Sequence, residues 1–269
     1  MKSKIIQALG VLLLPISFIA VLIVLNIVPF VPLSKYGSGG ILLTIIALGL
    51  TFVFAKRDGK TFNEIGFSLQ KITPIWFATG FLAGLFIAVI MFAIIISLTD
   101  LELVFLENAN IKTALLWLLA FFPLAYMEEI IFRGYAFTKI YKNLGIWPAQ
   151  ILLAILFTWY HDFTGATFFG QLLGPGVWAL IYGITALWTK GIAFPTGLHM
   201  ALNVVIALVG EKDSRHAIWN LEYANEITPL IESQTNRIGL IMQIAILIIG
   251  IVLTEIYRKR SFRRANGVR

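Results

Sequence analysis

The chain has 269 residues, of which 59% are hydrophobic and 13% are charged. Its mean hydropathy of +0.87 lies outside the range of water-soluble globular domains and indicates an integral membrane protein with several spans. The chain contains no cysteine, which excludes disulfides, thiolate metal sites and a cysteine nucleophile. The net charge of +7 is carried in short basic clusters beside apolar runs, as is typical of membrane flanks, so we expect no nucleic-acid partner.

Eight apolar stretches predict an all-α fold, a polytopic membrane bundle of about eight transmembrane helices. They are Ile5–Phe30, Gly39–Ala55, Ile75–Leu98, Thr113–Met127, Ile146–His161, Leu172–Trp188, Ile192–Val209 and Ile238–Tyr257. A helix needs about 20 residues to cross the hydrocarbon layer, so the fourth and fifth stretches are short unless they continue into their polar flanks. We interpret the first stretch as an uncleaved anchor and residues 1–269 as one transmembrane domain.

The distribution of Lys and Arg predicts the orientation of this bundle. Of the 21 basic residues, the connections that include both termini hold 16 and the alternate connections hold 5. Because cytoplasmic loops carry the excess of Lys and Arg, we expect both termini in the cytoplasm.

Two connections between the apolar stretches are unusual. The segment Asp162–Gly176, DFTGATFFGQLLGPG, is too apolar for an aqueous loop and too interrupted by glycine and proline for a helix. We expect it to re-enter the membrane or to line a cavity, where it would form part of a substrate entrance. The polar stretch Gly210–Arg237 is expected to be an extracytoplasmic loop with some amphipathic structure, in which His216 is solvated.

Two adjacent carboxylates, Glu128 and Glu129, end the fourth apolar stretch. Burying charge in a bilayer is costly, so such residues usually belong to a functional site. Arg133 follows Glu129 at the i, i+4 spacing of one helix face and is expected to keep Glu129 ionised. The competing interpretation is a structural ion network, or a cluster at the level of the lipid headgroups.

Two histidines lie in predicted spans, each with a neighbour at helical spacing. Phe157 precedes His161 by four residues, and Asn203 follows His199 by four. The side chains of His199 and Asn203 should therefore share one helix face, whereas Phe157 is expected to serve mainly in packing. Because polar side chains in lipid turn toward the bundle interior, the three spans that carry these residues should face one another.

Three chemistries fit this set of residues. In the first, Glu128 is a general base that works with a histidine on a water molecule, and His199 and Asn203 donate hydrogen bonds to an oxyanion. In the second, Glu128, His161 and His199 bind Zn²⁺ as in a metalloprotease, although no HExxH motif is present. In the third, the cluster relays protons in a transporter.

The order Glu128-Glu129-x-x-x-Arg133, Phe157-x-x-x-His161 and His199-x-x-x-Asn203 resembles the CAAX protease and bacteriocin-processing family. This family of intramembrane proteases includes the type II CAAX prenyl endopeptidases, and the resemblance covers about residues 113–209. It implies an eight-helix fold, a hydrolytic water activated by Glu128 and His161, support from Glu129 and Arg133, and an oxyanion stabilised by His199 and Asn203. It leaves open whether the cofactor is Zn²⁺ or none, and of the two we favour none.

The resemblance also implies the partners, namely membrane lipid and a peptide or protein substrate, for which a prenylated CAAX-type peptide is one option. We expect a cavity open to the cytoplasm. The alternatives are a non-catalytic binding or immunity protein of the same fold and a proton-coupled transporter. The shared site also requires the fourth and fifth helices to extend into the cytoplasm near Lys139–Trp147, since His161 must lie within about 10 Å of Glu128.

Overall fold

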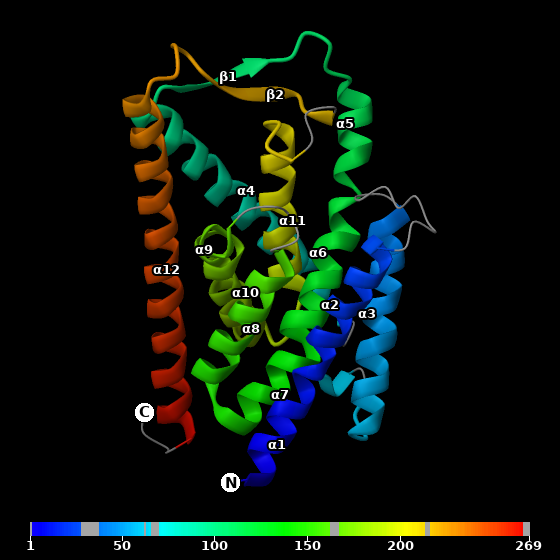
Figure 1. The fold of residues 1–269 in the computed structure, drawn as a ribbon. Coiled ribbons are helices and arrows are strands. Elements are labelled where there is room, and N and C mark those ends of the chain that lie inside the picture. The colour runs from blue at the N-terminus through cyan, green and yellow to red at the C-terminus, as the bar shows by residue number, and fades with distance from the viewer. Residues whose placement is uncertain are drawn as a thin grey trace.

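The fold is a bundle of helices that run mostly along one common direction, with both termini at the same end (Figure 1). The computed structural model describes residues 2–27, 38–61, 63–65, 70–161, 167–212 and 216–265. Within them, six helical stretches are long and apolar enough to cross a membrane: Lys4–Leu25, Gly39–Arg57, Thr73–Leu98, Ile111–Leu144, Phe168–Thr189 and Pro229–Arg264. Two shorter apolar helices, Ile146–His161 and Ala193–Leu208, bring the total to the expected eight. The all-α membrane bundle is confirmed, while the side of the membrane on which the termini lie stays a prediction.

The elements follow one another in a simple order. The first half contains α1 (Lys2–Val11), α2 (Leu13–Ile27), α3 (Ser38–Arg57), a 3-10 turn (Asn63–Ile65), α4 (Thr73–Leu98), β1 (Leu101–Phe105), α5 (Ile111–Leu118) and α6 (Phe121–Glu129). A π-helical turn (Ile130–Gly134), α7 (Tyr135–Leu144), α8 (Ile146–His161), α9 (Phe168–Gln171) and a second π-helical turn (Leu172–Gly176) come next. The chain ends with α10 (Val177–Thr189), α11 (Ala193–Leu208), β2 (Trp219–Tyr223) and α12 (Pro229–Ala265).

Helices α4 and α12 form the outside of the bundle. Apolar side chains remain exposed along them, for example Phe86 at 68% and Ile248 at 55%. In hydrocarbon such side chains need no cover, but every backbone N–H and C=O must be paired within the segment, which a helix achieves. These faces are therefore suited to contact lipid.

Helices α6, α7, α8, α10 and α11 form the inside. Every residue of α10 from Val177 to Ala186 is buried. The amide of Gln150 on α8 donates both to the carbonyl oxygen of Leu180 and to Thr254 Oγ1 on α12, each at 3.0 Å. Interhelical hydrogen bonds of this kind hold helices together where lipid removes the hydrophobic driving force.

Three glycines allow α4 and α11 to pack with their backbones in contact. A Cβ atom added to Gly197 would lie 2.1 Å from the carbonyl oxygen of Phe77, and one added to Gly80 would lie 2.1 Å from that of Phe194. A Cβ atom on Gly84 would lie 2.6 Å from the carbonyl oxygen of Leu198. Small residues at this spacing are typical of close helix pairs in membranes. The pair holds α11, which carries His199 and Asn203, in a fixed position.

The structure also contains two short strands, which the sequence analysis did not predict. β1 and β2 pair antiparallel, with Leu101 opposite Tyr223 and Phe105 opposite Trp219, at the end of the bundle away from the termini (Figure 1). The expected loop Gly210–Arg237 thus supplies β2 and the first turns of α12, which begins at Pro229 rather than Ile238. His216 is not simply solvated, because its ring packs 4.9 Å from that of Trp117.

Two further boundaries differ from the expectation. The fourth helix does not end at Met127, because the helical stretch runs from Ile111 to Leu144. One residue, Gly145 with φ of 92°, joins it to α8. Both helices thus extend to Lys139–Trp147 as expected, with the break at Gly145, while the cytoplasmic location of this region stays a prediction. The segment Asp162–Gly176 is helical from Phe168 onward, but the expected interruption is present as a kink at Gly174, whose ψ is −105°. Residues 162–166 lie outside the described part of the chain.

Candidate active site

The two carboxylates stand where an α-helix changes into a π-helical turn. Glu128 and Glu129 are the last residues of α6, and all five residues of the following turn, Ile130–Gly134, are buried. Gly134 has a ψ of −119°, which is not helical and redirects the chain into α7. Single π-helical turns inside α-helices often occur at functional sites, because they shift the register of the side chains that follow.

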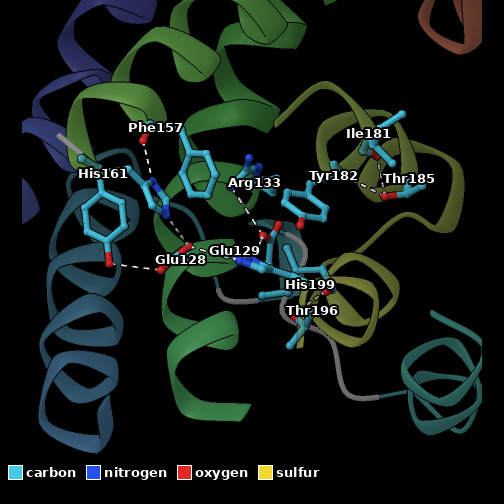
Figure 2. A network of polar contacts seen from close by, with 12 residues as sticks. Glu128, Glu129, Arg133, Phe157, His161, Ile181, Tyr182, Thr185, Thr196 and His199 are labelled. Carbon is cyan, nitrogen blue, oxygen red and sulfur yellow. Dashed lines mark hydrogen bonds and ion pairs between the residues drawn. The ribbon is translucent and has the colours of Figure 1, made fainter. Parts of the chain in front are cut away.

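Glu129 is fully buried and is held by two partners. His199 Nδ1 lies 3.0 Å from Glu129 Oε1, and Arg133 Nη1 donates to the same oxygen at 3.4 Å. The expected pairing of Glu129 with Arg133 is confirmed (Figure 2). The ion pair and the imidazole together compensate a charge that would otherwise be prohibitive inside the bundle.

Glu128 faces both histidines. Its Oε2 lies 3.5 Å from His199 Nε2 and 3.9 Å from His161 Nε2, while Tyr160 Oη donates to its Oε1 at 3.1 Å. The requirement that His161 lie within about 10 Å of Glu128 is therefore met. Figure 2 shows the two carboxylates between His161 and His199, which come from different helices.

The hydrogen bonds of the imidazoles fix where their protons lie. A backbone carbonyl can only accept, so His161 Nδ1, at 2.8 Å from the carbonyl oxygen of Phe157, must carry the proton. By the same reasoning His199 Nδ1 donates to the Glu129 carboxylate. In the neutral rings both Nε2 atoms are then acceptors, and they point toward Glu128 Oε2, which is buried and makes no hydrogen bond within the described part of the chain. Three acceptors that converge in this way suit a ligand that brings protons or positive charge, such as water or a metal cation.

Aromatic rings enclose this cluster. The ring of Phe157 lies 4.5 Å from that of His161 and 4.1 Å from the guanidinium of Arg133. Tyr182 stacks on His199 with 4.7 Å between the rings. Phe157 thus packs as expected, but it packs against the polar residues of the site and also anchors His161 through its carbonyl group.

A cavity of about 360 Å³ adjoins the cluster. His161, His199 and Asn203 border it, as do Gln171 and Pro175 from the segment that was expected to line a cavity. Further walls come from apolar residues of α4 and α11, from Trp178 and Tyr182 on α10, and from Met242 and Gln243 on α12. Asn203 therefore opens onto the same space as both histidines.

The position of this cavity indicates the side of the bundle that it faces. Its α4 residues, from Ala88 to Ile95, lie in the half of the helix that leads to β1, and Lys212 also borders it. These residues place the cavity between the site and the strand end of the bundle, the end that lies opposite the termini in Figure 1. Glu128 lies near the middle of the stretch Ile111–Leu144 rather than near one end, because the fourth helix is longer than expected. With the termini in the cytoplasm, as predicted, this cavity would face the other side.

Glu128, His161 and His199 offer donor atoms that could serve a Zn²⁺ ion. Two imidazole nitrogens and one carboxylate oxygen are the right kinds of ligand for a catalytic zinc. The described residues nevertheless contain no group of three or more His, Cys, Asp or Glu side chains with the arrangement of a metal site. The ligand types therefore suit zinc, whereas their present arrangement does not form a zinc site. If a zinc ion binds, Glu128, His161 and His199 are the residues that would hold it.

The structure brings together all seven residues predicted for the site, although their catalytic roles stay predictions. The sequence analysis missed Tyr160, which donates to Glu128, and Tyr182, which stacks on His199. Tyr160 adjoins His161 and follows Phe157 by three residues, so helical spacing could have indicated it. No comparable signal pointed to Tyr182.

The comparison with known families agrees with this geometry. Residues 110–205 match the family described as Type II CAAX prenyl endopeptidase Rce1-like, and this range contains every residue of the cluster. This match supports the resemblance to the CAAX protease and bacteriocin-processing family over about a third of the chain. At the level of that family it supports an intramembrane protease, a hydrolase with a peptide or protein substrate in a lipid surrounding. No curated protein matches the chain.

Proposed function

We propose that the chain is an endopeptidase that hydrolyses a peptide bond with a water molecule activated by Glu128 and His161. The observation that carries this proposal is the convergence of Glu128 Oε2 and the Nε2 atoms of His161 and His199. A water molecule placed among three acceptors is oriented by them and loses a proton more readily. Glu128 is only 7% exposed, so a water molecule held by it would be kept apart from bulk solvent.

The proposed reaction begins when Glu128 takes a proton from the water, whose oxygen attacks the carbonyl carbon of the substrate. The C=O double bond opens, and its electron pair becomes the negative charge of a tetrahedral oxyanion. When the C–N bond breaks, the proton passes from Glu128 to the leaving nitrogen. The products are a carboxyl group and an amine.

We propose Asn203 and His199 as the donors to the oxyanion; because His199 Nδ1 is engaged by Glu129, His199 would donate from Nε2 only as the imidazolium. The side-chain amide of Asn203 supplies N–H donors and opens onto the cavity that His161 borders. His199 is held in place by Glu129, which is itself held by Arg133. Fixed donors of this kind stabilise developing charge without reorganising during the reaction.

The substrate is proposed to lie in the cavity of about 360 Å³. Its α4 wall of Ala88, Met91, Phe92 and Ile95 suits a hydrophobic segment, so a peptide that carries a prenyl group is a candidate. If Zn²⁺ is the cofactor, it would be held by Glu128, His161 and His199, and would polarise the substrate carbonyl and the water.

The proposal is tested with detergent-purified full chain and a quenched fluorescent peptide, offered with and without a prenyl group. Glu128→Gln removes the base while keeping the size of the side chain, and we expect cleavage to fall by about 10²-fold or more. The matched control is Glu232→Gln on α12, an exposed carboxylate outside the site, which should leave cleavage unchanged.

Full cleavage by Glu128→Gln would remove Glu128 as the base. Absence of cleavage by the wild type with either peptide would instead favour a binding protein of the same fold. Metal analysis of the same samples, and activity after treatment with a chelator, decide between zinc and a metal-free site.

A further inference from the structure

A second polar cavity lies at the end of the bundle that carries the termini. Its volume is about 370 Å³, and its charged residues are Arg133, Lys142, Lys190 and Glu64. The walls between them come from α7, from the turn between α10 and α11, and from Tyr257 on α12. None of the residues that border this cavity borders the cavity at His161 and His199.

The cavity carries an excess of positive charge. Its one carboxylate, Glu64, already pairs with Lys60, which lies outside the cavity and donates to it at 2.9 Å. The hydrogen bond from Lys60, together with those from Thr61, lowers the pKa of Glu64 to about 2, so Glu64 is ionised and its charge is compensated at neutral pH. Lys142 and Lys190 have no salt bridge within the described part of the chain, which leaves the cavity electropositive.

Arg133 gives this cavity a buried donor. The residue is only 3% exposed, and while its Nη1 faces Glu129, its Nη2 has no hydrogen-bond partner among the described residues. A buried guanidinium nitrogen without a partner is costly, because it has given up its hydration. A planar guanidinium beside two lysines is an arrangement that binds phosphate groups.

The place of the cavity in the bundle suits a ligand from the lipid headgroups. Tyr141 and Tyr257 border it with their rings 6.3 Å apart, and aromatic residues are typical of the membrane interface. The basic residues Arg258, Lys259 and Arg260 follow directly after Tyr257 on α12. Clusters of this kind beside a span attract anionic lipids.

We propose that this cavity binds a phosphate group, either in the headgroup of an anionic phospholipid or as free phosphate. Lys142 and Lys190 attract the anion, and Arg133 offers it the nitrogen that Glu129 leaves unused. The anion and Glu129 then share one guanidinium, which links the cavity to the residue that holds His199. The binding itself does not depend on the proposed proteolysis, so the two proposals fail separately.

The experiment measures binding by calorimetry to the full chain, purified in a non-ionic detergent and stripped of native lipid. The probes are dihexanoylphosphatidylglycerol and inorganic phosphate, both at constant ionic strength. Lys142→Gln/Lys190→Gln should raise the Kd of the bound probe at least tenfold. The matched variant Lys112→Gln/Arg237→Gln removes the same charge from exposed residues outside the cavity and should change the Kd less than twofold.

Each outcome has a definite meaning. Binding of the phospholipid without competition from phosphate identifies a headgroup as the ligand, whereas equal binding of inorganic phosphate identifies the free anion. Failure of both probes to bind, or equal weakening by the two double variants, overturns the proposal. Should the first double variant fail to fold, Lys190→Gln alone serves, because Lys190 is exposed and follows the end of α10.

Discussion

Apolar residues are abundant both in the inner helices α6, α8, α10 and α11 and in the outer helix α12. The two regions differ in how much of this apolar surface the protein buries. Every residue of α10 from Val177 to Ala186 is buried, whereas only Gly250 and Thr254 are buried among the described side chains of α12. A span must be apolar in either place, because lipid and protein interior both exclude charge. What separates the regions is the polar side chains, which gather inside and carry the proposed chemistry.

The largest difference in the free energy of unfolding is expected when a buried ion pair and an exposed ion pair are broken. Arg133→Leu leaves the buried carboxylate of Glu129 without its cation, and we expect a loss of about 3–5 kcal/mol in the free energy of unfolding. Lys60→Gln breaks a pair whose side chains are about half exposed, and should cost far less, because water screens the two charges. Unfolding in mixed micelles measures both, and similar losses would show that burial does not separate the two pairs.

Two isoleucines test the packing in the same way. Ile131 is fully buried beside the site, and Ile131→Ala should cost about 2–5 kcal/mol, since the cavity it leaves cannot be filled. Ile248 is 55% exposed on α12, where lipid replaces the missing methyl groups, so Ile248→Ala should be nearly neutral. The idea of a loosely packed outer helix fails if Ile248→Ala costs as much as Ile131→Ala.

A pair of glycines compares the seam between α4 and α11 with the surface of α12. Gly197→Ala forces a Cβ atom against the carbonyl oxygen of Phe77, which is backbone and yields little, so we expect a loss of about 1–3 kcal/mol. A Cβ atom on Gly239 meets nothing within 4 Å, and Gly239→Ala should be neutral or slightly stabilising. Thermal unfolding of the two variants in one detergent checks this, and a neutral Gly197→Ala would contradict the close packing.

The smallest expected effect concerns a single hydrogen bond in the inner region. Tyr160→Phe removes the donor to Glu128 Oε1, and one such bond to a charged group contributes about 1.5–3 kcal/mol. We expect part of this to appear as cleavage slowed by about tenfold, because Glu128 Oε1 loses its donor. Tyr223→Phe, in the strand ribbon, is the control. Cleavage at the wild-type rate by Tyr160→Phe would separate this hydroxyl from the chemistry.

The sequence predicted which charged residues and histidines meet inside the bundle, but it did not predict all of their contacts. Burial of charge in lipid is so costly that Glu128, Glu129 and Arg133 had to face inward, and the histidines had to meet them. The contacts of Tyr160 and Tyr182 were not predictable in this way, because a tyrosine in a membrane helix is equally suited to packing and to the interface. The π-helical turn Ile130–Gly134 could not be predicted from the sequence either, because its residues are also compatible with an ordinary α-helix.

The errors at the outer helices have a different origin. Hydropathy reports the part of a helix that lies in hydrocarbon, and it ends where polar residues begin. The stretch from Pro229 to Arg237 is polar but compatible with a helix, so α12 continues through it beyond the predicted limit. Pairing of β1 with β2 joins residues more than a hundred positions apart, and no local pattern specifies it.

The ribbon of β1 and β2 limits how the bundle can open. It joins the end of α4 to the start of α12, where Asp100 also accepts from Asn225 and Gln234 donates to the carbonyl oxygen of Leu98. Both helices contribute residues to the wall of the 360 Å³ cavity. At the ribbon, α4 and α12 cannot separate without breaking its hydrogen bonds. A gap between the two helices can therefore widen only farther along their length, away from the strands.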